Sequence, residues 1–167
     1  VALESYSASW EKFSGDNSAS VSAANDRAYI ASVSGASRYT YNATPASADY
    51  SVSADCYLAS TLSNCTCGPI GRATATGPNF YLARAIYGAG YQLFKNVSGS
   101  YTQLGSTSSK TFSSSTSYNV KLDMAGTAIK VYVEGSGSAA ISQTDSAISA
   151  ANKPGIYLNV GNNSENA

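Results

Sequence analysis

Short runs of β-branched and aromatic residues, separated by clusters of Ser, Gly, Asn and Thr, recur from one end of this chain to the other. An apolar stripe with helical spacing nowhere extends beyond about two turns, so the runs indicate strands and not helices. Many short strands at this spacing predict an all-β fold, either a sandwich or a barrel. Together with the paired strands near the C-terminal end, they favour a two-sheet antiparallel β-sandwich. The expected strands are residues 9–13, 28–33, 38–41, 50–58, 69–75, 80–87, 91–97, 101–104, 118–124, 129–134, 139–143 and 155–160.

Alternation of polar and apolar residues assigns the faces of the clearest strands, because successive side chains of a strand point to opposite sides of the sheet. In residues 50–58, the predicted core face consists of Tyr50, Val52, Ala54, Cys56 and Leu58. Residues 118–124 and 129–134 form a predicted hairpin around a turn at 125–127, in which Gly126 is free to adopt positive φ. Its inward set is Tyr118, Val120, Leu122, Met124, Ile129, Val131 and Val133, and its outward set is Asn119, Lys121, Asp123, Lys130, Tyr132 and Glu134.

Residues 80–87 do not alternate, since both faces of this run are apolar apart from Arg84. Such a run favours a central strand that is covered on both sides, or a strand that lines a groove. Residues 107–117 are rich in Ser and have the length of a loop between strands. Residues 145–152 are expected to hold one helical turn on a long connection.

With 167 residues and 43% hydrophobic content, the chain is long enough for one well-buried core, which predicts a single domain over residues 1–167. We interpret it as a processed chain or as a piece of a longer polypeptide, because it starts at Val1 and stops just after a strand-like stretch. Ten Lys and Arg balance ten Asp and Glu, which argues against nucleic acid as a partner. The lack of a long apolar run argues against membrane insertion.

Cys56, Cys65 and Cys67 lie close together in the sequence, and the chain has no histidine. A structural zinc site built from Cys and His needs four ligands, so such a site is disfavoured. If residues 49–59 and 64–75 form a hairpin, Cys56 falls opposite Cys65 or Cys67, within reach of a disulfide bond. The alternative is three reduced cysteines that pack as small core residues.

The middle of the chain carries a series of motifs: Gly71-Arg72, residues 79–84, residues 91–95 and residues 99–104, followed by residues 118–122 and 129–135. In strand spacing and aromatic placement, the stretch from Tyr50 to Leu158 resembles the laminin G-like family of jelly-roll domains, which have a concanavalin A-like fold. Modules of this kind occur in secreted glycan-active proteins, in adhesins, and in phage tail or capsid-decorating proteins. The resemblance therefore implies a jelly roll at an extracellular location or on a virion surface, and it specifies fold better than function.

An enzyme on this fold would most often be a glycoside hydrolase, which needs two carboxylates about 5 to 10 Å apart. The motif Glu-x-Asp-x-x-Glu, which the retaining members of the fold commonly carry on one strand, is absent. Asp55 and Asp123 lie on expected outward strand faces, where solvated surface carboxylates are the simpler interpretation. Without His, a Ser-His-Asp arrangement is impossible. We therefore expect no enzymatic activity and assign no catalytic residue.

Thirteen Tyr and one Trp provide flat amphipathic surfaces on which a sugar ring can stack. Arg72, Arg84 and Lys95 add hydrogen-bond donors for hydroxyl groups or for an acidic sugar. The predicted ligand-binding patch, drawn from strands that should be neighbours, is Tyr57, Arg72, Asn79, Tyr81, Arg84, Tyr87 and Tyr91. The alternative is that half of these tyrosines fill the core or an interface, because Tyr suits strands in any sandwich.

Calcium is the one cofactor that we considered for the loops, because oxygen ligands on rim loops suit this ion. The available clusters are Asp16 with Asn17, Asn25 with Asp26, and Asn162 with Asn163 and Glu165. None has a diagnostic spacing, and Asx-rich turns at strand ends explain them equally well. No cofactor or metal site is therefore assigned.

Asn-x-Ser/Thr sequons begin at Asn42, Asn64, Asn96 and Asn162. In a eukaryotic secreted protein they would mark loops that carry glycans. In a Ser- and Asn-rich prokaryotic or phage chain they arise from composition, which is the interpretation we favour.

The leading hypothesis is a non-catalytic carbohydrate-binding or adhesive module on a virion or cell surface, with a glycan as its partner. The first alternative is a structural subunit of a capsid, tail or filament that binds only neighbouring subunits, and the second is a glycoside hydrolase. A glycan binder concentrates exposed aromatic residues in one concave site, whereas an assembly protein spreads apolar area over flat contacts.

Overall fold

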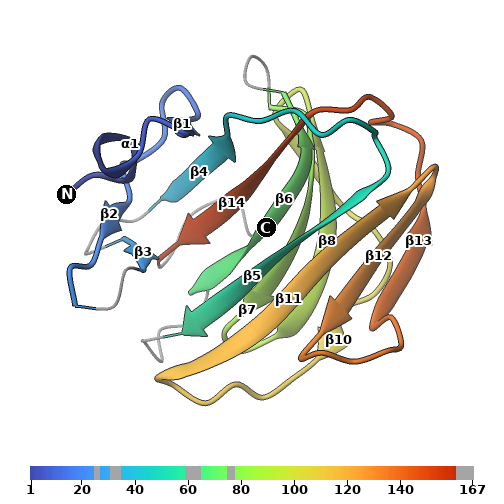
Figure 1. Cartoon of the computed structure of the whole chain (residues 1–167). Coiled ribbons are helices and arrows are strands. Elements are labelled where there is room, and N and C mark those ends of the chain that lie inside the picture. Colours follow the sequence, from blue (N-terminus) through green and yellow to red (C-terminus); the bar gives the residue numbers. More distant parts are fainter. Residues whose placement is uncertain (25–26, 31–34, 59–64, 75–77, 161–167) are drawn as a thin grey trace.

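Two antiparallel sheets face each other across a shared core in the computed structural model of this chain, which describes residues 1–24, 27–30, 35–58, 65–74 and 78–160 (Figure 1). Within these residues the one helix is the short α1 (Leu3–Tyr6) at the N-terminal end. The predicted all-β, two-sheet antiparallel sandwich is confirmed.

The large sheet has eight strands, and its order is β1 (Trp10–Lys12), β4 (Ala36–Tyr41), β14 (Lys153–Asn159), β6 (Thr66–Ala73), β7 (Phe80–Ile86), β8 (Gly90–Val97) and β10 (Ser108–Ser109), with β9 (Ser100–Gln103) also paired to β8. The small sheet has the order β13 (Ile141–Thr144), β12 (Ala128–Val133), β11 (Thr116–Ala125) and β5 (Tyr50–Leu58). A separate two-stranded sheet pairs β2 (Ser20–Val21) with β3 (Ala28–Tyr29).

The main core lies between the two sheets and uses the inward sets that alternation predicted. Val120, Leu122 and Val131 are completely buried, while Val133 is partly buried and packs against the same cluster. Each fully buried aliphatic side chain contributes about 1.5–3 kcal/mol through removal of apolar surface from water. The hairpin of β11 and β12 is formed as expected, and Gly126 in its turn has a φ of 55°.

β7 is buried along its whole length, as its lack of alternation predicted. One face of the strand points into the main core, and the other carries Phe80 into a second cluster on the outer side of the large sheet. There the Phe80 ring makes edge contacts with Phe13 and Tyr101, at centroid distances of 5.8 and 5.9 Å. A central strand covered on both sides is therefore the correct one of the two interpretations.

The structure corrects the expected hairpin of residues 49–59 with residues 64–75. β5 pairs with β11 in the small sheet, whereas β6 pairs with β14 and β7 in the large sheet. β5 and β6, which follow one another in the sequence, thus belong to different sheets. The expected helical turn at 145–152 is not formed either. Of the expected strand 28–33, only Ala28–Tyr29 is a strand, and residues 31–34 lie outside the described part.

All three cysteines are free thiols in the structure, so the predicted disulfide bond is not formed. The thiols of Cys56 and Cys67 nevertheless meet in a hydrogen bond between β5 and β6. This hydrogen bond, followed by burial, raises the pKa of the Cys67 thiol well above its ordinary value. Of the two partners considered for Cys56, the structure places Cys67 in direct contact with it.

Candidate functional site

The residues of the predicted ligand-binding patch do not come together on one exposed surface. Tyr57 is exposed, and Asn79 and Tyr87 are half-buried. The others are buried, with Arg72, Tyr81 and Tyr91 between the sheets and Arg84 on the opposite face of β7. The physical reason is that β5, which carries Tyr57, belongs to the small sheet, whereas the other residues of the patch come from the large sheet and the loop residues directly before and after β7. The strands were predicted to be neighbours in one sheet, but β5 does not pair with the others.

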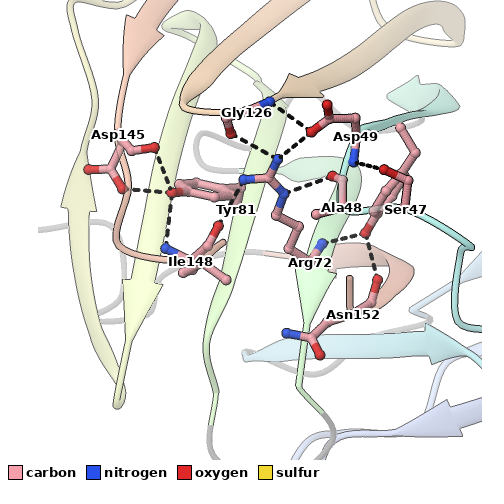
Figure 2. A network of polar contacts seen from close by, with 10 residues as sticks. Ser47, Ala48, Asp49, Arg72, Tyr81, Gly126, Asp145, Ile148 and Asn152 are labelled. Carbon is pink, nitrogen blue, oxygen red and sulfur yellow. Dashed lines mark hydrogen bonds and ion pairs between the residues drawn. The ribbon is translucent and has the colours of Figure 1, made fainter. Parts of the chain in front are cut away.

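Arg72 holds one rim of the sandwich together (Figure 2). Its guanidinium donates hydrogen bonds of 2.9, 2.9 and 3.0 Å to the backbone carbonyls of Ala48, Ile148 and Gly126. Asp49 adds an ion pair at 3.5 Å and accepts a bond of 2.7 Å from the Gly126 amide. With its partners on three separate segments and its side chain only 1% exposed, Arg72 is a structural residue that orders the rim.

Two buried tyrosines of the predicted patch also have a structural role, because the hydroxyl group of each donates a hydrogen bond to a carboxylate at the edge of the core. Tyr81 donates to Oδ1 of Asp145 at 2.6 Å, and Tyr91 donates to Oε1 of Glu134 at 2.6 Å. Burial, and then the bond to the carboxylate, raise the pKa of both phenols above the ordinary value. Both phenols therefore stay neutral, and because both rings are buried they are unavailable for stacking on a ligand.

Arg84 lies on the outer side of the large sheet and is covered there. Its guanidinium donates to Oε1 of Gln92 at 2.8 Å and stacks on the Phe94 ring at 4.4 Å from the centroid. Gln92 in turn donates to Thr107 at 3.1 Å. Arg84 is only 2% exposed, so a ligand cannot reach it without displacing its cover.

The accessible polar surface that the structure does build is the outward side of the small sheet, which we call the outer face. Alternation on β5, β11 and β12 places on it Ser51, Ser53, Asp55, Tyr57, Asn119, Lys121, Asp123, Lys130 and Tyr132. Hydroxyl, amide, carboxylate, ammonium and phenol groups alternate along it without a block of one charge. Such a mixture of donors and acceptors suits a ligand rich in hydroxyl groups.

A shallow hollow of about 400 Å³ opens on the outer face at the C-terminal end of β12. It is lined by Asn119, Lys121, Tyr132, Gly135, Ser136 and Gly137. The ammonium of Lys121 lies 5.3 Å from the centre of the Tyr132 ring. An aromatic ring beside hydrogen-bonding groups is the usual composition of a small-ligand site.

The loop that borders the hollow is held in a defined position. Glu134 and Gly135 both adopt positive φ, 53° and 72°, which turns the chain sharply after β12. Glu134 is fixed by Tyr91 from the core and by an ion pair of 2.9 Å with Lys110. The hydrogen bond from Tyr91, and then that from Lys110, lower the pKa of Glu134 below its ordinary value, so the carboxylate stays ionised and the loop stays anchored.

The two outward carboxylates do not form a catalytic pair. Asp123 faces Ser51 across the β5–β11 ladder, where Asp55 faces Asn119. Four strand positions therefore separate the carboxylates, about 14 Å at the usual rise of a strand, which exceeds the spacing that glycoside hydrolysis uses. Each is hydrogen-bonded to its own neighbour, Asp55 to Asn119 at 2.8 Å and Asp123 to Ser51 at 2.6 Å.

The loop residues considered for calcium have other roles where the structure describes them. Asp16 binds the side chain and the backbone amide of Arg38, with an ion pair of 2.6 Å. Asn25, Asp26, Asn162, Asn163 and Glu165 lie outside the described residues. Within the described part of the chain, the structure brings together no group of three or more acidic or Cys side chains that could hold a metal ion.

Two of the sequons can be placed. Asn42 is exposed, whereas Asn96 is completely buried and accepts a hydrogen bond from the Gly99 amide, so of these two only Asn42 is accessible to a glycan in the folded chain. Asn64 and Asn162 lie outside the described residues.

Comparison with known proteins identifies the fold. No protein-family profile and no curated protein sequence matches this chain. Among solved structures, the carbohydrate binding module CBM66 from Bacillus subtilis matches with a TM-score of 0.73 and 17% identity, over 90% of this chain and 88% of that chain. This chain and that module share one β-sandwich fold. At this identity the likeness concerns the fold alone, and it does not single out the laminin G-like family.

The hollow escaped sequence reasoning even though its strand residues were correctly oriented. Alternation points Asn119, Lys121 and Tyr132 outward, but the predicted ligand-binding patch lies on strands with more tyrosines. The Gly135-Ser136-Gly137 segment was the missing signal, because a glycine-rich loop directly after a strand leaves open space beside it.

Of the described residues, none belongs to a helix long and apolar enough to cross a bilayer.

Proposed function

We propose that this chain is a non-catalytic carbohydrate-binding module whose ligand site is the hollow on the outer face of the small sheet. The observation that carries the proposal is the placement of the Tyr132 ring, the Lys121 ammonium and the Asn119 amide around one open space. The matching fold of a carbohydrate binding module supports it. We also propose that the module works outside the cell or on a virion surface as an adhesive part, where polysaccharide is encountered.

In the proposed complex, a sugar ring stacks on Tyr132 and its hydroxyl groups exchange hydrogen bonds with Lys121 and Asn119. Tyr combines an apolar ring with a polar edge, which matches the alternating faces and rims of a sugar. Ser136 and the backbone of the bordering loop supply further polar contacts, directly or through water. Because the loop is anchored through Glu134, little ordering is needed on binding, and this favours affinity.

Retention on polysaccharides tests the proposal. The probe is a panel of immobilised cellulose, xylan, mannan, starch, inulin, chitin and polygalacturonate, and we expect the wild-type chain to be retained on at least one. Tyr132→Ala should lower the affinity about tenfold or more, because an aromatic contact contributes about 0.5–1.5 kcal/mol beyond its buried area. Tyr6→Ala is the matched control, since Tyr6 is 58% exposed on α1, beside the large sheet (Figure 1).

A second variant fills the hollow without removing any group. A Cβ added at Gly137 meets no atom within 4 Å, and Gly137 is not in the positive-φ region. Gly137→Leu should therefore keep the melting temperature of the wild type while it blocks retention. The control is Ser138→Leu, which adds the same side chain in the same exposed loop but outside the lining of the hollow. Gly88→Leu is not a suitable control, because Gly88 has a φ of 90°, which a leucine adopts only with strain.

Three results would contradict the proposal. The first is a wild-type chain that is retained on no polysaccharide, and self-association in that case would favour the structural-subunit alternative. The second is unchanged retention of both Tyr132→Ala and Gly137→Leu, which would place the ligand elsewhere. The third is release of reducing ends that Asp55→Asn or Asp123→Asn abolishes, which would make the chain a glycoside hydrolase.

A further inference from the structure

The outer face carries a second aromatic residue that the hollow does not include. Tyr57, near the end of β5, is 38% exposed and points to the same side of the small sheet as Tyr132. The guanidinium of Arg27 lies over its ring at 4.2 Å from the centroid, as Lys121 lies near the Tyr132 ring. Each ring is thus accompanied by a cationic donor, an arginine at Tyr57 and a lysine at Tyr132.

The strand register fixes how far apart these rings are. Tyr57 faces Ser117 on β11, and Tyr132 faces Lys121 on the same strand from the other side. Four positions along β11 and two strand spacings across the sheet place the two Cα atoms about 17 Å apart on a diagonal. A single sugar ring cannot touch both tyrosines, whereas an extended chain of several sugars can.

The surface between the two rings is polar throughout. Ser117, Asn119 and Lys121 follow one another along β11 on the outer face, and Asp55 on β5 pairs with Asn119 at the midpoint. The side-chain amide of Asn119 uses its nitrogen to donate to Asp55 and still has its carbonyl oxygen as an acceptor. The Asp55 carboxylate has a second oxygen. Both side chains can therefore accept hydrogen bonds from the hydroxyl groups of a ligand. This diagonal, from Tyr132 through Asn119 to Tyr57, is called the outer-face track.

The residue beside the midpoint of the outer-face track, Asp55, bears on the charge of a glycan that could lie there. Asp55 is exposed, and an anionic group placed over it would be repelled. Hydroxyl groups meet no such repulsion. At its centre, between the cations Lys121 and Arg27, the track therefore favours an uncharged sugar over a uronic acid.

We propose, on the basis of the carbohydrate-binding function above, that the outer-face track binds a linear glycan, uncharged where it crosses Asp55, with Tyr132 and Tyr57 as the two stacking positions. The ligand lies across β12, β11 and β5. Engagement of the second tyrosine follows binding at the first and is intramolecular, so it raises the affinity without a new independent binding event.

A ladder of chain lengths tests the track. The probe is the polysaccharide that retains the wild-type chain, partially hydrolysed with acid and fractionated by length, and the measurement is the dissociation constant for each fraction. For the wild type we expect the affinity to rise by about tenfold or more between the monosaccharide and the oligomers that span both tyrosines, and then to level off.

The two tyrosines should separate in this assay. Tyr57→Ala should abolish the gain with length and leave the affinity for the shortest fractions unchanged, whereas Tyr132→Ala should weaken every fraction. Tyr41→Ala is the control, because Tyr41 is 41% exposed but lies on β4 of the large sheet. Asp55→Asn should raise the affinity for polygalacturonate oligomers relative to neutral ones.

The outcomes distinguish the track from the proposed function itself. If affinity does not depend on length, or if Tyr57→Ala behaves as the wild type on long oligomers while Tyr132→Ala loses binding, the track is overturned and the hollow stands. If polygalacturonate binds as tightly as the neutral chains and Asp55→Asn changes nothing, the uncharged ligand is overturned. If the wild type binds no fraction, both proposals fall.

Discussion

The phenolic hydroxyl of Tyr81 lies 2.6 Å from Oδ1 of Asp145, while its ring is completely buried between the sheets. The Tyr81 oxygen also accepts a bond of 3.3 Å from the Ile148 amide (Figure 2). The second oxygen of Asp145 binds the Lys95 ammonium at 2.5 Å. These contacts join β7 and β8 of the large sheet to the segment that follows β13. Tyr81 thereby closes one end of the core, which is a role in stability and not in ligand binding.

Substitution of Tyr81 should lower the free energy of unfolding and leave glycan retention intact. Tyr81→Phe removes the bond to an ionised carboxylate and should cost about 1.5–3 kcal/mol. Tyr81→Ala also opens a cavity in the core and should cost about 3–5 kcal/mol. Urea unfolding measures both changes, and Tyr6→Phe is the exposed control. Normal stability of Tyr81→Ala together with lost glycan retention would show that the residue contacts ligand.

Arg72 should tolerate replacement by Lys poorly, although the charge is kept. A Lys ammonium cannot reproduce the planar fork that reaches Ala48, Gly126 and Ile148, so carbonyl groups at the rim, including that of buried Ile148, lose their donor. We expect Arg72→Lys to reduce the free energy of unfolding by about 2–4 kcal/mol. Thermal unfolding followed by circular dichroism checks this, with Lys130→Arg on the outer face as a control. Equal melting temperatures for Arg72→Lys and the wild type would contradict the structural role.

Acid should destabilise the fold through carboxylates that hold tyrosines. Hydrogen bonds from Tyr91 and Lys110 lower the pKa of Glu134, and for Asp145 burial raises the pKa but is outweighed by bonds from Lys95 and Tyr81, so it too is lowered. A lowered folded-state pKa means that these groups stabilise the fold above their ordinary values of 4.5 and 3.8, and that this stability is lost as the pH falls through the folded-state values.

Melting temperatures recorded between neutral pH and the acid range test this behaviour. They should stay level down to the ordinary carboxyl pKa values and then fall. Asp145→Asn should start from a lower melting temperature and show a shallower fall, because one of the linked protonations is gone. A rise in stability on acidification would contradict the assignment of these carboxylates.

The contact between Cys56 and Cys67 predicts a disulfide bond between the two sheets under oxidising conditions. With glutathione disulfide as oxidant, an unreduced digest should contain the Cys56–Cys67 cross-link. The melting temperature should also rise, because the cross-link closes a loop that restricts the unfolded chain and adds about 2–4 kcal/mol to the free energy of unfolding. Since the pKa of Cys67 is raised, the reactive thiolate is scarce at neutral pH and the reaction should be slow and faster in alkali.

The matched variants for the disulfide are Cys65→Ser, which should still form the cross-link, and Cys67→Ser, which should not. Mass spectrometry that finds three free thiols after prolonged oxidation would refute the pairing. A cross-link through Cys65 would show that the residues around it rearrange before oxidation.

Sequence alone determined the class of fold and the orientation of most strand side chains. Alternation is a local property of an extended backbone, so Val120, Leu122 and Val131 point inward and Lys121 and Tyr132 point outward whichever strand lies beside them. In the same way, the continuous apolar run of β7 was sufficient to predict a strand covered on both faces.

Only the tertiary structure decided which strands pair and therefore which outward residues share a surface. β5 pairs with β11, far along the chain, instead of with the adjacent β6, and no local pattern encodes that choice. The direction of Arg72 likewise depends on the irregular register of β6 beside β14 and on a φ of 51°, which turn the side chain into the core. Burial of Tyr81 and Tyr91 follows from the packing of one sheet on the other, and the outer-face hollow follows from a loop anchored through Tyr91. These features arise from contacts between distant segments, which alternation within a strand cannot report.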